Sequence, residues 1–188
     1  MDLYEIFVHQ NPTWSSKEIV CFMILLCLLM MTGFVLIKKN KIKIVQGIAV
    51  LLIYIFLFIV FASTVFTRIP TAGATYNLQL LWSYRYVIEN HSAGMLEEIL
   101  LNCVLLMPLG ILLPFALERP VKVRFAFLAG LLVSCSIEVC QRVFHRGLFE
   151  WDDILHNTLG CVIGYWAAGK LYGYIRRREK DERREVDR

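Results

Sequence analysis

The chain has 188 residues, of which 57% are hydrophobic and 19% charged, and its mean hydropathy is +0.57. A soluble domain of this length needs no such excess of apolar residues, and long apolar blocks are the pattern of membrane-spanning helices. The net charge is +4, but the basic tail alternates with acids and has no aromatic residues, which argues against a nucleic-acid partner.

Five apolar segments follow one another, each close to the roughly 20 residues that cross the hydrocarbon core of a bilayer. They cover residues 18–37, 44–66, 98–117, about 125–144 and about 154–175. The third is broken by Pro108, Gly110 and Pro114. We therefore expect an all-α membrane protein, a bundle of about five transmembrane helices that remains anchored through its first segment.

Basic residues fix the expected orientation of these helices. Lysines and arginines concentrate after the first segment, after the third and in the tail after the fifth. These alternate connections lie on one side, and positively charged loops stay in the cytoplasm. The sequence thus predicts an outside N-terminus and a cytoplasmic C-terminus, with anionic membrane lipids as contacts of the basic side. We divide the chain into an N-terminal segment with the first helix (1–43), a four-helix membrane domain (44–175) and a charged cytoplasmic tail (176–188).

The connection over residues 67–97 is long for a membrane loop and belongs to the outer side. It carries Trp82, Tyr84 and Tyr86, aromatic residues of the kind that sit at the membrane–water interface, and the basic residues Arg68 and Arg85. We expect this connection to lie on the membrane surface as a partly helical cap.

Polar residues concentrate where the fourth and fifth segments meet, in "IEVCQRVFHRGLFEWDDILHNTLG" over residues 137–160. Glu138 lies about two turns, roughly 9 Å, inside its helix. Asn157 and Asn102 each lie about one turn inside theirs. Three helices should therefore bring polar groups to a similar depth, where they face a cavity or a partner rather than lipid.

Helical spacing predicts which side chains share a face. Small and polar residues recur at intervals of three or four along the fourth segment (Gly130, Ser134, Glu138 and Arg142, with Gln141 beside them) and along the fifth (Asp153, Asn157, Gly160, Gly164 and Ala168). Small residues in such rows mark close helix–helix contacts in membranes. These rows should face the bundle interior and form close helix–helix contacts there.

Two interpretations of the polar cluster remain open. In a structural role, Glu138 pairs with Arg142, Asp153 caps the fifth helix and Asn157 bridges helices. In a functional role, an outward-facing pocket offers carboxylates to a proton, a cation or an amphiphile. No metal site is expected, because His145 and His156 lack a ligand spacing. The six cysteines all lie in apolar runs and indicate no disulfide framework.

The chain resembles the VanZ-like family of small bacterial membrane proteins. The resemblance spans about residues 50–174 and rests on "LNCVLLMPLGILLP" (101–114), "SIEVCQ" (136–141) and "DDILHNTLGCVIGY" (152–165). The family's polar signature falls on Asn102, Pro108, Gly110, Glu138, Gln141, Asp152, Asp153, Asn157 and Gly160. Glu150 stands where an aspartate is common in the family, and His156 where an aliphatic residue is usual.

The resemblance implies a multi-pass protein of the bacterial cytoplasmic membrane with an envelope role at the outer face, since the family takes its name from a protein linked to resistance to teicoplanin. One hypothesis is a non-enzymatic binder of a lipid-like or lipoglycopeptide molecule. The alternative is a membrane enzyme on a lipid or lipid-linked cell-wall precursor, with Glu138 or Asp153 as acid/base. A transporter fits poorly, because no internal repeat is visible. No cofactor is expected. The candidate ligand-binding residues are Asn102, Glu138, Gln141, Arg142, Asp152, Asp153, Asn157, Arg68, Trp82 and Arg85.

Overall fold

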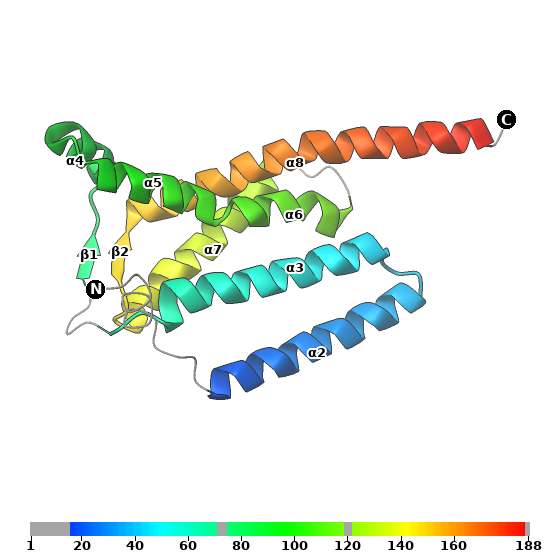
Figure 1. The fold of residues 1–188 in the computed structure, drawn as a ribbon, viewed down its shortest axis with the longest axis horizontal. Helices are drawn as coiled ribbons and strands as arrows, with labels where there is room; N and C mark the ends of the chain where they lie inside the picture. The colour runs from blue at the N-terminus through cyan, green and yellow to red at the C-terminus, as the bar shows by residue number, and fades with distance from the viewer. Residues whose placement is uncertain (1–15, 71–74, 119–121, 187–188) are drawn as a thin grey trace, which may run out of the picture.

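The computed structural model describes residues 16–70, 75–118 and 122–186, and these form the expected all-α bundle with very little sheet (Figure 1). The elements in chain order are α2 (Ser16–Lys38), α3 (Ile44–Phe61), the π-helical turn η1 (Ala62–Phe66), β1 (Thr75–Asn77), α4 (Trp82–Asn90), α5 (Ala93–Leu105), α6 (Met107–Leu117), α7 (Val123–Val143), β2 (Leu148–Glu150) and α8 (Trp151–Val186).

Four helical segments of the described chain are long and apolar enough to cross a membrane. They are Ile19–Lys38, Ile44–Phe66, Ala93–Leu117 and Val123–Val143, which correspond to the first four segments expected from the sequence. The fifth expected segment forms the first part of α8. This helix carries His156, Asn157 and Lys170, which lower its hydropathy. His156 and Asn157 are buried where α8 packs against α5, α6 and α7, whereas Lys170 is exposed and lies over the ring of Trp166.

The third segment is divided into two helices at Leu106. This residue leaves the helical conformation (φ −100°, ψ 7°) and is fully buried. Pro108 follows in the first turn of α6, where a missing N–H is tolerated because no intrahelical bond is needed there. The expected interruption of this segment is therefore confirmed, and its position is set by Pro108 rather than by Pro114, which α6 accommodates.

Glycines of α8 and α6 allow these helices to approach until backbone touches backbone. A Cβ atom added at Gly160 would collide with the carbonyl oxygen of Cys103, and one at Gly164 with that of Met107. A Cβ at Gly110 would collide with the carbonyl oxygen of Cys161. The predicted glycine row of the fifth helix is thus a close contact, and its partners are α5 and α6.

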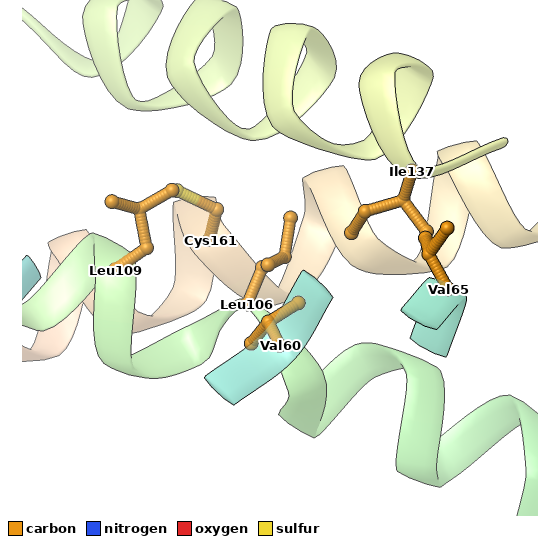
Figure 2. Close-up of a cluster of buried hydrophobic side chains, with 6 residues drawn as sticks. All are labelled: Val60, Val65, Leu106, Leu109, Ile137 and Cys161. Carbon is orange, nitrogen blue, oxygen red and sulfur yellow. The ribbon is translucent and has the colours of Figure 1, made fainter. Parts of the chain in front are cut away.

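The apolar core lies between α3, η1, α6, α7 and α8. Figure 2 shows its six buried side chains turned toward one another: Val60, Val65, Leu106, Leu109, Ile137 and Cys161. The helix break at Leu106 contributes to this core, because it turns that side chain inward. All six cysteines are free, in keeping with their places in apolar helices.

One end of the bundle carries the polar elements of the protein. β1 and β2 form a two-stranded parallel sheet in which Tyr76 pairs with Phe149 and Asn77 with Glu150. These strands lie with α4 and the start of α8 at the end opposite the C-terminus (Figure 1). We call this region the polar end. The connection 67–97 is partly helical as predicted, through α4 and the first residues of α5, whereas the strand β1 was not expected.

Candidate functional site at the polar end

Asp152 holds the start of α4 in place. Its Oδ1 accepts a hydrogen bond from the backbone N–H of Leu81 at 2.6 Å. Its Oδ2 accepts from the backbone N–H and the hydroxyl of Ser83, at 3.0 and 2.6 Å. Leu81 has a positive φ of 61°, which costs energy for a bulky residue. The buried carboxylate thus caps a helix from another element and stabilises a strained turn.

Asp153 and Asn157 connect α8 to its neighbours. Asp153 Oδ1 accepts from the side-chain amide of Asn102 on α5 at 2.6 Å. Asn157 donates to the hydroxyl of Ser134 on α7 at 3.0 Å, which confirms that it bridges helices. The prediction that Asp153 caps the fifth helix is wrong, because α8 already begins at Trp151 and Asp153 lies inside its first turn.

Glu138 fixes β2 to α7. Its carboxylate is 1% exposed, and Oε2 accepts from the backbone N–H of Glu150 at 3.0 Å. The predicted pair with Arg142 is wrong, because the guanidinium of Arg142 instead lies 5.5 Å from the ring centre of Tyr76. The strand β2 occupies the space beside Glu138, so this carboxylate binds backbone rather than a cation.

Glu150 is a buried carboxylate among other acids. Its side chain is 7% exposed, and its Oε1 has no hydrogen-bond partner among the described residues. Burial raises the pKa of Glu150 from 4.5 to about 7, and the negative charges of Asp153 and Glu98 add to this effect. The indole N–H of Trp82 acts in the opposite direction on this pKa, although it lies outside normal hydrogen-bond geometry. The carboxyl group of Glu150 therefore titrates near neutral pH.

A small cavity lies among these groups. Its lining comes from α4, α5, β2 and α8 and consists of Trp82, Ser83, Met95, Glu98, Ile99, Asn102, Glu150, Asp152, Asp153 and His156. The volume of this cavity is about 10 Å³, which is room for about one water. Within the described residues, there is no group of three or more His, Cys, Asp or Glu side chains that could hold a metal ion.

Side chains of α7 and of the loop after it close the end of η1. Gln141 is buried and donates to the carbonyl of Thr64 at 3.1 Å. Arg146 donates to the carbonyls of Val65 and Phe66. A helix end leaves such carbonyls unpaired, so these side chains complete its hydrogen bonding.

A second, larger space opens on the other side of β2. This groove is lined by Tyr76, Leu78, Val139, Arg142, Val143, Phe149 and Trp151, and its volume is about 450 Å³. The alternation of the strand separates the two spaces: Phe149 faces the groove, whereas the next residue, Glu150, faces the buried acids. On α7, Arg142 lies at the groove although it is four residues from the buried Glu138. The prediction that Arg142 belongs to the interior row is therefore wrong.

The structure brings most of the predicted site residues together at the polar end. The small cavity is lined by Asn102, Trp82, Asp152 and Asp153, whereas Glu138 binds the backbone N–H of Glu150 on β2 and does not line it. Arg68 is exposed, but its charge acts on Asp153. Arg85 is exposed on α4 and lines neither space.

Sequence reasoning missed several groups at this site. In the sequence, Glu150 stands out only as a departure from the family pattern. Its burial could not be predicted, because it depends on the strand β2, and three residues are too few to show a periodic pattern. Tyr84, noted as an interfacial aromatic, lies 3.0 Å through its hydroxyl from Nε2 of His156. The roles of Ser83 and Glu98 had no signal in the sequence, since both depend on contacts with α8 or β2.

The described chain is that of a multi-pass α-helical membrane protein whose buried polar groups gather at one end of the bundle. The sequence profile of the family described as VanZ/LLP1 matches residues 47–172, about two thirds of the chain, and the protein belongs to this family. The match begins in α3 and ends in α8, so α2 precedes it. No curated protein and no solved structure matches the chain significantly.

Proposed function

We propose that the protein binds a lipid-like or lipoglycopeptide molecule at the extracytoplasmic face of the bacterial cytoplasmic membrane, and that this binding protects against teicoplanin-type glycopeptides. The groove beside β2 supports this proposal most directly. Its volume of about 450 Å³ lies within the range of small-molecule sites. Its lining of aliphatic and aromatic side chains with one arginine suits a molecule that has an acyl chain and a polar part.

The groove replaces the polar pocket as the expected place of the ligand. The cavity among the buried acids has room for about one water, far less than a lipid or a lipoglycopeptide needs. Glu138 and Asp153 each hold a hydrogen bond that fixes another element. The alternative function, acid–base catalysis on a lipid-linked cell-wall precursor, is therefore less well supported than binding.

The test fills the groove with a large side chain. Val139→Trp places an indole at a groove position of α7, while Leu132→Trp is the matched control two turns away on the same helix, exposed but outside the groove. A strain without the gene is complemented with each variant. We expect Val139→Trp to lose teicoplanin protection and binding of a fluorescent teicoplanin derivative at an unchanged membrane level, and Leu132→Trp to keep both.

Full protection and binding by Val139→Trp would refute the groove as the binding site. Purified protein is also incubated with a labelled lipid-linked cell-wall precursor. Conversion of this precursor by the parent protein would favour the enzyme over the binder.

A further inference from the structure

The groove holds one charged residue, Arg142, among the described side chains that line it. No carboxylate of the described chain lies within ion-pair distance of its guanidinium. The other arginines nearby are engaged differently. Arg146 donates to backbone carbonyls, and Arg68 lies against Gly147 with its charge acting on the buried acids. Arg142 therefore presents its donors to the groove.

Tyr76 determines where this charge is held. The guanidinium lies 5.5 Å from the ring centre of Tyr76, in the range of a cation–π contact. Such stacking leaves the N–H groups at the edge of the guanidinium plane available. Their fork geometry matches the oxygens of a phosphate group.

The groove is apolar where it runs deeper along α7. Arg142 and Val143 are the last residues of the helix before the polar end, and Val139 lies about one turn further inside. Phe149 and Trp151 also line the groove, with their rings in an edge contact at 5.5 Å between centroids. The groove thus has a charged residue near the polar end and apolar residues further inside. A phospholipid in one leaflet has the same arrangement, with its phosphate at the surface and its acyl chains below.

We infer that the groove is a binding site for an anionic phospholipid, with its phosphate on Arg142 and one acyl chain along Val139 and Trp151. This inference rests on the proposed function and names the class of molecule that occupies the site in the membrane. A lipoglycopeptide that enters the groove then competes with this lipid. Binding of the lipid weakens as salt rises, because the contact at the membrane surface is screened.

The experiment uses Trp151 as the reporter. The full chain is reconstituted into phosphatidylcholine bilayers that contain increasing fractions of brominated phosphatidylglycerol or brominated phosphatidylcholine, whose bromines quench nearby indoles. The difference between the parent and Trp151→Phe isolates the signal of Trp151. We expect half-quenching of Trp151 at about a tenfold lower fraction of the anionic lipid, the size expected for a charge-assisted contact.

Arg142→Gln should reduce this preference to less than about twofold, and Arg142→Lys should retain part of it. The matched control is Arg124→Gln, since Arg124 is also stacked on an aromatic ring but at the other end of α7. This control should keep the full preference. An unchanged preference in Arg142→Gln, or none in the parent, would overturn the inference.

Addition of a teicoplanin-type compound separates this inference from the proposed function. Relief of quenching on its addition supports both. A lipid preference that depends on Arg142, with no effect of the compound, supports the lipid site and counts against the proposed function. Binding of the compound by a protein without lipid preference supports the proposed function and overturns the lipid site.

Discussion

Replacing Gly160 by alanine tests the contact between α8 and α5, where the described glycines leave the least room for a Cβ atom. The added Cβ atom would overlap the carbonyl oxygen of Cys103, which is backbone and cannot move aside as a flexible side chain can. Overpacking of this kind typically costs about 1–3 kcal/mol, and a rigid neighbour favours the upper end. Alanine in a helix returns about 1 kcal/mol relative to glycine. We therefore expect a net loss of about 2 kcal/mol in the free energy of unfolding.

Gly169→Ala is the control on the same helix. Apart from its own turn of helix, no atom of the described chain lies within 4 Å of a Cβ at position 169, so only the gain in helix propensity of at most about 1 kcal/mol remains. In thermal unfolding of detergent-solubilised protein, about 2 kcal/mol corresponds to a decrease in Tm of roughly 4–8 °C for Gly160→Ala. Gly169→Ala should melt at or slightly above the parent. A Gly160→Ala protein that melts as high as Gly169→Ala would show that α8 and α5 are not in backbone contact.

Three further predictions concern the polar end. Glu138→Ala should lower the free energy of unfolding by about 1–3 kcal/mol, because the buried N–H of Glu150 loses its acceptor. Glu138→Gln keeps an acceptor oxygen and should lose less. Equal losses in the two variants would contradict this role. The pKa of Glu150 is raised from 4.5 to about 7, so the folded state binds this proton more tightly than the unfolded state does. The protonated carboxyl group therefore contributes at most about 3 kcal/mol to the free energy of unfolding. This contribution is complete below pH 4.5 and is lost as the pH rises to 7. Chemical denaturation of Glu150→Gln across this range should show a flatter profile, and a slope equal to the parent's would count against it. The proposed orientation is tested with single cysteines at the exposed positions Glu89 and Lys39. In intact cells, a membrane-impermeant thiol reagent should label the cysteine at Glu89 and not the one at Lys39, with unsubstituted protein as background. The reverse pattern would invert the proposed orientation.

The membrane helices could be predicted from the sequence because their formation depends mainly on local composition. A segment in lipid must satisfy its own backbone hydrogen bonds, so a long apolar run becomes a helix whatever its neighbours are. The expected limits of residues 44–66 agree with α3 and η1, and those of about 125–144 with α7 (Val123–Val143). Helical periodicity likewise placed Ser134, Glu138 and Asn157 on interior faces, because spacing along one helix fixes relative direction.

The tertiary structure decided which partner each polar group takes. Asp152 binds Leu81 and Ser83, about 70 positions earlier in the chain, and no local pattern encodes such a contact. The sheet of β1 and β2 has three residues in each strand, too few for a periodic signal, yet β2 places Glu150 beside Glu138. The backbone N–H of Glu150 binds this carboxylate, for which the sequence predicted Arg142 as the partner. Arg142 lies instead at the groove beside Tyr76, because partners supplied by distant strands cannot be read from spacing along one helix.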